Sequence, residues 1–158
     1  MDADFDPIRE AHRRWVEHGW ADAADGMALV TSITRVQAVF QQRIDGLLKP
    51  FDLTFARYEV LQLLSFSRTG SLPMGAIGRR LQVHPTSVTS AIDRLERQGF
   101  VVREDHPTDR RAKLATLTEE GRAVVKQATA VLNEQVFSDP GVDPAAVTEL
   151  VDLLADIR

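Results

Sequence analysis

The sequence contains no cysteine, no apolar stretch of membrane-spanning length and no secretory signal pattern at its start. Without thiols, a disulfide framework, a cysteine nucleophile and a thiolate metal site are excluded. No stretch reaches the roughly 18 uncharged apolar residues that a membrane-spanning helix needs, so no membrane association is predicted. The acidic start, residues 1–6, lacks the basic and apolar regions of a secretory signal. We therefore expect a cytoplasmic protein.

The composition is that of an ordinary globular chain, but its charge is unevenly distributed. The 158 residues are 44% hydrophobic, enough for one compact domain with helical extensions, and the net charge is −4. Residues 79–113 contain eight Lys or Arg and five Asp or Glu, a net charge of +3 that leaves −7 for the remainder. A basic segment on an acidic chain indicates a negatively charged partner such as double-stranded DNA.

Apolar spacing and capping residues predict a mainly helical chain with one hairpin. Apolar residues recur at steps of three and four, and N-cap or proline residues precede most of these segments. The predicted helices span residues 7–18, 23–48, 54–67, 73–81, 85–98, 118–137 and 143–157. A period near two predicts strands at 100–103 and 111–117, around a turn cluster at 105–109. The fold class is therefore mainly α with a small β-hairpin wing: a winged helix-turn-helix with a separate helical layer.

The same periodicity selects side chains for the core. The 23–48 helix is long for a small domain, so we expect it to pack along a partner. The side chains expected to face inward in three other helices are Tyr58, Leu61, Leu63 or Leu64, and Phe66; Val88, Ile92 and Leu95; and Val124, Ala128, Val131 and Val136.

The helix predicted at 85–98 has a face suited to reading DNA. If its apolar residues dock on the core, the opposite face presents small hydroxyl and basic side chains, with Asp93 among them. Small residues near a helix N-terminus allow close approach to bases and phosphates. The candidate DNA-binding residues of this helix are Thr86, Ser87, Thr89, Ser90, Arg94 and Arg97. The alternative is a surface helix with capping hydroxyls, because a short helix pair alone is a weak signal.

The hairpin supplies the second group of candidate DNA-binding residues. Its tip and returning strand carry Asp109, Arg110, Arg111 and Lys113. Arginine on such a tip matches the narrow minor groove in shape and charge, and an adjacent aspartate can hold one guanidinium in place. The alternative is a solvated turn with a local ion pair that contributes little to stability.

These segments together resemble the MarR family of bacterial transcription regulators. The matching motifs are Asp-Arg-Leu-Glu at 93–96 followed by Gly99, Asp-Arg-Arg at 109–111, and Leu-Thr at 117–118. The resemblance implies a homodimer on a pseudo-palindromic operator, with dimerisation through residues 1–52 and 119–158 and a winged helix-turn-helix at 53–118. It also implies that Arg111 enters the minor groove with Asp109 bracing it. Ser87, Thr89 and Ser90 would lie at bases, and Thr86 at a phosphate.

The N-terminal segment is similar to the urate-responsive branch of that family. In that branch an added helix brings a tryptophan to the ligand pocket, and Trp15 matches this residue. Arg103 matches a basic ligand residue, whereas Glu59 replaces an aspartate and Phe66 replaces an arginine unless Arg68 substitutes for it. The resemblance implies a small anionic or aromatic effector, with Trp15, Glu59, Arg103 and His12 as candidate ligand-binding residues. The alternative is that Trp15 is a core aromatic.

Two other functional classes compete with this interpretation. An enzyme is disfavoured because the sequence has no glycine-rich phosphate loop, no nucleophile elbow and no histidine–carboxylate cluster at metal spacing. We therefore predict no catalytic residue, no metal site and no resident cofactor. A protein-interaction module that does not bind DNA is the other alternative, and the basic wing argues against it. The function that we expect is therefore that of a DNA-binding, ligand-responsive repressor.

Overall fold

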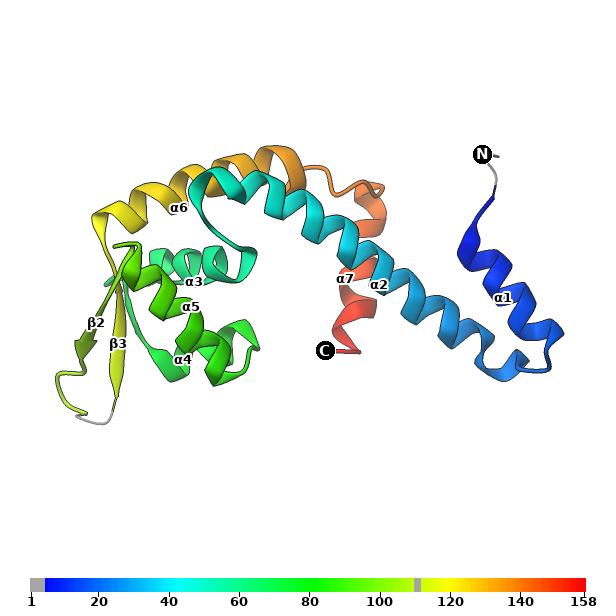
Figure 1. The fold of residues 1–158 in the computed structure, drawn as a ribbon, viewed down its shortest axis with the longest axis horizontal. Helices are drawn as coiled ribbons and strands as arrows, with labels where there is room; N and C mark the ends of the chain where they lie inside the picture. Colours follow the sequence, from blue (N-terminus) through cyan, green and yellow to red (C-terminus); the bar gives the residue numbers. More distant parts are fainter. Residues whose placement is uncertain (1–4, 110–111) are drawn as a thin grey trace. The chain divides into compact units, whose positions relative to one another are not determined.

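The computed structural model describes residues 5–109 and 112–158, and its elements follow the predicted order (Figure 1). The helices are α1 (Pro7–Glu17), α2 (Ala21–Leu48), the 3₁₀ helix η1 (Lys49–Phe51), α3 (Phe55–Phe66), α4 (Met74–Leu81), α5 (Pro85–Arg97), α6 (Glu119–Leu132), the π-helical turn η2 (Asn133–Phe137) and α7 (Pro144–Ala155). The strands are β1 (Ser71–Pro73), β2 (Val101–Asp105) and β3 (Lys113–Leu117). The chain forms two compact units, residues 1–43 and 44–158. The predicted division by role at 52 and 118 stays a prediction.

Among the described helices, α1, α3, α6 and α7 begin at side-chain caps that the sequence predicts. Each cap oxygen accepts a hydrogen bond from a free backbone N–H of the first helical turn, which would otherwise lack a partner. The pairs are Asp6 with Ile8 (2.8 Å), Thr54 with Arg57 (3.4 Å), Thr118 with Gly121 (3.0 Å) and Asp143 with Ala145 (2.9 Å). The caps fix the starts of α1, α3, α6 and α7 within one or two residues of the predicted positions.

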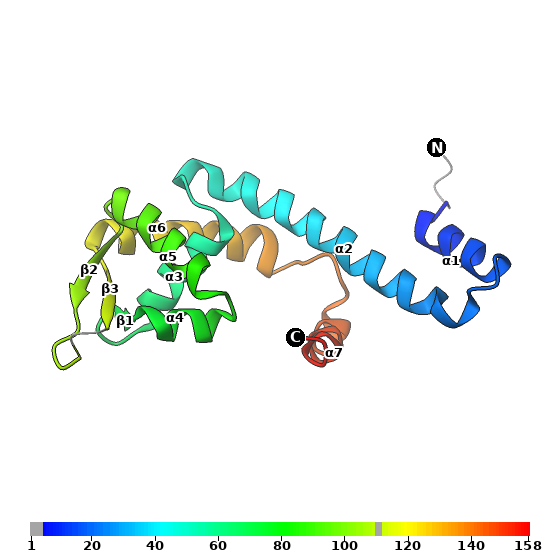
Figure 2. The ribbon, with the colours of Figure 1, turned by 60° about the horizontal axis from the view of Figure 1, so that its bottom comes forward.

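The wing is a three-stranded antiparallel sheet with the strand order β1–β3–β2 (Figure 2). The predicted hairpin is confirmed, because Val101 pairs with Leu117 and Asp105 with Lys113. Strand β1 was not predicted. It pairs on the other side of β3, with Ser71 opposite Thr116, and the hydroxyls of these two residues hydrogen-bond at 2.7 Å.

The core of the second unit joins α3, α4, α5, α6 and the base of the wing. On α5, the predicted residues Val88, Ile92 and Leu95 are all buried. On α3, Tyr58, Leu61 and Leu64 are buried, but the prediction for Phe66 was wrong, since this side chain is 76% exposed. Phe66 comes five residues after Leu61, which turns it toward solvent at 100° per residue.

The inward face of α6 differs from the prediction by one position. Val125 and Leu132 are buried, whereas the predicted Val124 and Val131 are half-buried. Ala128 and Val136 are buried as expected. The predicted single helix ends at Leu132, where its last turn widens into η2, and Val136 continues the buried face four residues after Leu132.

The first unit consists of α1 and the larger part of α2. His12 Nε2 lies 2.7 Å from Asp25 Oδ1, and Trp15 packs edge-on against Trp20 with ring centroids 5.4 Å apart. Much of the apolar surface of α2 has no cover in the isolated chain, because Leu29, Val30, Ile33, Val36 and Val39 are all exposed. No described helix is both long and apolar enough to cross a membrane.

Candidate nucleic-acid interface

Helix α5 is held so that its polar face points to solvent. Its N-terminus is capped by His84, whose ring nitrogen accepts a hydrogen bond from Thr86 N at 3.2 Å, and Pro85 occupies the first helical position. Burial of the Val88, Ile92 and Leu95 side chains fixes the rotation of the helix. The six predicted DNA-binding residues of α5 are therefore all exposed: Thr86, Ser87, Thr89, Ser90, Arg94 and Arg97.

Five of these residues gather along a groove of 710 Å³ between α5 and the start of α3, here called the arginine groove. Its lining consists of Thr54, Ala56, Arg57, Thr86, Ser87, Ser90, Ala91, Arg94 and Arg97. Three guanidinium groups beside several hydroxyls form a surface with the charge and donors that phosphate oxygens require. The groove therefore suits the backbone of a nucleic acid.

Sequence reasoning missed the contribution of α3 to this groove. Arg57 lies about 30 residues before α5 and carries no motif, so only its position in the first turn after the Thr54 cap could have suggested it. Its guanidinium donates to the Asp52 carbonyl oxygen at 2.9 Å and to Gln98 Oε1 at 3.0 Å. Burial lowers the pKa of Arg57, opposed by nearby Asp52 and reinforced by Arg94, yet an arginine stays charged at neutral pH.

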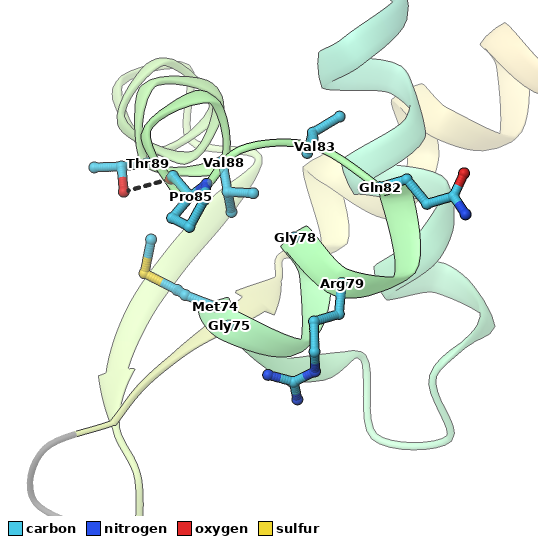
Figure 3. Close-up of a pocket in the computed structure, with 9 residues that line it drawn as sticks. All are labelled: Met74, Gly75, Gly78, Arg79, Gln82, Val83, Pro85, Val88 and Thr89. Atoms are coloured by element: carbon cyan, nitrogen blue, oxygen red, sulfur yellow. Dashed lines mark hydrogen bonds between the residues drawn. The ribbon is translucent and has the colours of Figure 1, made fainter. Parts of the chain in front are cut away.

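Thr89 lies on a different side of α5, along a pocket of 420 Å³ shared with α4 (Figure 3). The pocket is lined by Met74, Gly75, Gly78, Arg79, Gln82, Val83, Pro85, Val88 and Thr89. The Thr89 hydroxyl donates to the Pro85 carbonyl at 3.1 Å, which leaves it as an acceptor for other groups. At Gly78 an added β-carbon would lie 3.3 Å from the Val83 carbonyl oxygen, so glycine allows the helix-turn-helix to pack closely.

The base of the wing is joined to α5 by Arg103. This side chain of β2 pairs with Asp93 and, at 3.1 Å, with Glu96, and it is 28% exposed. Further along the hairpin, Lys113 pairs with Asp105 across the two strands, and Asp109 is exposed. The predicted DNA-binding residues Arg110 and Arg111 lie outside the described residues.

The four candidate effector residues are described in two separate units. His12 and Trp15 belong to α1, where they contact Asp25 and Trp20. Glu59 and Arg103 belong to the second unit. Burial raises the pKa of the half-buried Glu59 carboxyl, whereas both acidic partners of Arg103 hold its guanidinium on α5. Within the described part of the chain, no three histidine or acidic side chains are grouped to hold a metal ion.

Comparisons with known proteins decide the family. A family model described as the MarR family matches residues 51–112. The crystal structure of Sco5413, a MarR family transcriptional regulator from Streptomyces coelicolor, has a TM-score of 0.76 and 45% sequence identity over 85% of this chain and 93% of that one. The chain belongs to the MarR family of transcriptional regulators.

Two further relatives were found by sequence. The HTH-type transcriptional repressor Rv2887 from Mycobacterium tuberculosis is 32% identical over 109 residues, which cover 69% of this chain and 77% of Rv2887. YhbI, an HTH-type transcriptional regulator from Bacillus subtilis, is 35% identical over 85 residues, and the match spans about half of each chain, 54%. In this MarR-family chain, the winged helix-turn-helix consists of α4, α5 and the wing.

Proposed function

We propose that the chain is a sequence-specific DNA-binding regulator that acts as a homodimer on a pseudo-palindromic operator and represses transcription. The observation that carries the proposal is the arginine groove beside the exposed hydroxyl face of α5. A surface helix with capping hydroxyls would not require three arginines to converge from two helices. This arrangement therefore favours the DNA-reading interpretation.

The residues divide into two roles on DNA. Ser87, Thr89 and Ser90 are short side chains near the N-terminus of α5, so they allow that end to reach base edges in the major groove. Thr86 and the arginines of the groove suit phosphates, which position the protein without reading sequence. The wing residues Asp109, Arg110, Arg111 and Lys113 are proposed to contact the minor groove beside it.

Exposed apolar surface supports the homodimer. The α2 residues named above are uncovered, and so are Leu150, Val151, Leu153 and Leu154 of α7. An uncovered apolar face on a helix of this kind marks an interaction site, and this holds for each of the two helices by itself. Residues 79–113 carry a net charge of only +3 and neutralise few phosphates, so two copies are needed for useful affinity. The dimer must set its two α5 helices about 34–36 Å apart to match successive turns of DNA.

We also propose a small anionic or aromatic effector. Its candidate binding residues are His12 and Trp15 in the first unit, and Glu59 and Arg103 in the second unit. An anionic effector would compete with Asp93 and Glu96 for the Arg103 guanidinium, and this would loosen the wing from α5. The test is titration with urate, salicylate and other aromatic acids while tryptophan fluorescence is recorded in a Trp20→Phe variant. No response from Trp15 would leave that residue structural.

The relatives are transcriptional regulators, and we propose no catalytic activity and a cytoplasmic location, where DNA is accessible. Repression agrees with the name of Rv2887. The decisive experiment is a footprint on the region upstream of the protein's own gene, followed by affinity measurements at several salt concentrations. A steep negative slope of log affinity against log salt is expected. If no site is protected and the affinity does not change with salt concentration, a protein-interaction module that does not bind DNA is favoured instead.

A further inference from the structure

Asp52 differs from the residues around the arginine groove in charge and in backbone conformation. It lies between η1 and α3, and its φ of 50° places it in the left-handed region that mainly glycine and asparagine adopt. Its side chain is 66% exposed. A carboxylate beside a surface for DNA repels phosphates and lowers affinity. Its presence there therefore calls for a compensating role.

Asp52 contacts the C-terminal end of α5 at two positions. Its Oδ2 lies 3.1 Å from Arg94 Nη2. Gln98, the C-cap residue of α5, donates from Nε2 to the Asp52 carbonyl oxygen at 2.8 Å and to Oδ2 at 3.0 Å. The same carbonyl oxygen accepts from Arg57. Asp52 thus connects the C-terminal end of α5 to the first turn of α3.

The contact with Arg94 orients this side chain while leaving most of its donors for DNA. A guanidinium has five N–H donors in a rigid plane, and among the described side chains Asp52 holds one edge of it through Nη2. Arg94 still lines the arginine groove. An arginine held at one edge samples fewer conformations than a free one. Its side chain therefore loses less conformational entropy when it binds DNA.

We propose that Asp52, anchored to the end of α5 by Gln98, is a positioning residue that raises the specificity of DNA binding by restricting Arg94. The inference rests on the proposed DNA-binding function. On a cognate site, the pre-ordered Arg94 meets its phosphate or base without further ordering. On other DNA, the carboxylate competes with any loosely placed phosphate for the same guanidinium. Asp52 therefore lowers non-specific binding more than it lowers specific binding.

Two substitutions test the proposal, because asparagine and glycine both tolerate left-handed backbone. Asp52→Asn removes the charge and keeps an acceptor for Gln98, and Asp52→Gly removes the whole side chain. Affinities are measured on a duplex selected by the wild-type protein from a random pool and on a scrambled duplex of equal length. We expect the ratio of the two affinities to fall about 1.5-fold to fivefold, the range that an exposed ion pair gives. On the scrambled duplex the salt slope should steepen by about 0.9, one additional phosphate contact.

Matched variants separate the proposed role from general charge and from folding. Asp139→Asn, an exposed acid in the loop before α7, should leave the affinity ratio unchanged. In an Arg94→Ala background, Asp52→Asn should no longer change the ratio, because its effect acts through Arg94. An unchanged ratio in both Asp52 variants, or an equal fall without Arg94, overturns the proposal. A wild-type protein that does not discriminate between the duplexes overturns the proposed function instead.

Discussion

Replacing Gly121 with alanine should destabilise the junction between the wing and α6. Gly121 is buried in the first turn of α6, where its N–H donates to the Thr118 cap. A β-carbon there would overlap the Phe100 carbonyl oxygen and would lie 3.0 Å from the Phe100 carbonyl carbon and 2.8 Å from Leu117 Cδ1. Two of these three atoms are backbone, and the Phe100 carbonyl also accepts from Thr118 N at 3.1 Å. The overlap therefore cannot be relieved by turning a side chain.

The size of the effect follows from two opposing terms. Alanine is favoured over glycine inside a helix by about 1 kcal/mol. Overpacking costs about 1–3 kcal/mol, and more where backbone must move. Because the overlap is with backbone, we take the upper end of the overpacking cost, about 3 kcal/mol. The net loss is then about 2 kcal/mol, which lowers the melting temperature by roughly 4–8 °C for a chain of this size.

Thermal unfolding followed by circular dichroism measures this loss, with chain concentration held constant because a dimer's stability depends on it. The matched control is Gly46→Ala on α2, where an added β-carbon meets no atom within 4 Å. This variant should gain up to about 1 kcal/mol from helix propensity alone. A Gly121→Ala protein that melts at or above the wild-type temperature would refute the packing argument.

Three further predictions concern the arginine groove and the half-buried carboxyl of Glu59. Arg97→Ala should weaken binding to all duplexes and reduce the salt slope by about 0.9, whereas Lys126→Ala on the exposed side of α6 should change neither quantity. Ser90→Ala should relax base preference at one operator position by about 1 kcal/mol, measured by comparing single-base variants of the selected duplex; equal losses on every duplex would show that Ser90 contacts phosphate. Burial raises the pKa of Glu59 above 4.5, so the ionised carboxyl lowers stability at neutral pH. Glu59→Gln should therefore raise the melting temperature at pH 7, and the gain should disappear as the pH falls below 4.5; a constant gain at all pH values would contradict this cause.

Caps and periodicity were sufficient to predict most of the helices. Asp6, Thr54, Thr118 and Asp143 each carry a side chain that replaces a missing helical hydrogen bond, so the chemistry that begins the helix is visible in the sequence. The inward face of α5 was equally predictable, because three apolar residues at steps of four and three leave no other face to bury.

Strand β1 and the face of α6 depend on tertiary contacts that the sequence does not display. Three residues ending in Pro73 have little strand propensity, and they are extended because β3 offers a free edge. Pro73 stands at the end of this edge strand, where its missing N–H is tolerated. In α6, valines at 124 and 125 fit a helical stripe equally well, and packing selects the second.

The residues of the candidate site that lie on α5 were predicted from the sequence, whereas the residues that reach it from earlier segments were missed. The exposed residues of α5 follow from the direction of its apolar face. Arg57 lines the same groove and Asp52 contacts Arg94 from about 30 residues before α5, and no spacing rule connects them to that helix. A left-handed aspartate also has no sequence signature, because glycine is the usual residue for that conformation.

Strand β1 passes directly into α4, since Pro73 ends the strand and Met74 begins the helix. The sheet of the wing is therefore joined to α4 without a connecting loop, and β3 pairs with β1 on one side and with β2 on the other. If the hairpin enters a minor groove as proposed, we expect a tilt of the hairpin to pass through α4 to the N-terminal end of α5. A short flexible insertion between residues 73 and 74 would uncouple the wing from α4 without changing any proposed DNA-contacting side chain. The wing and α5 would then bind DNA independently of each other.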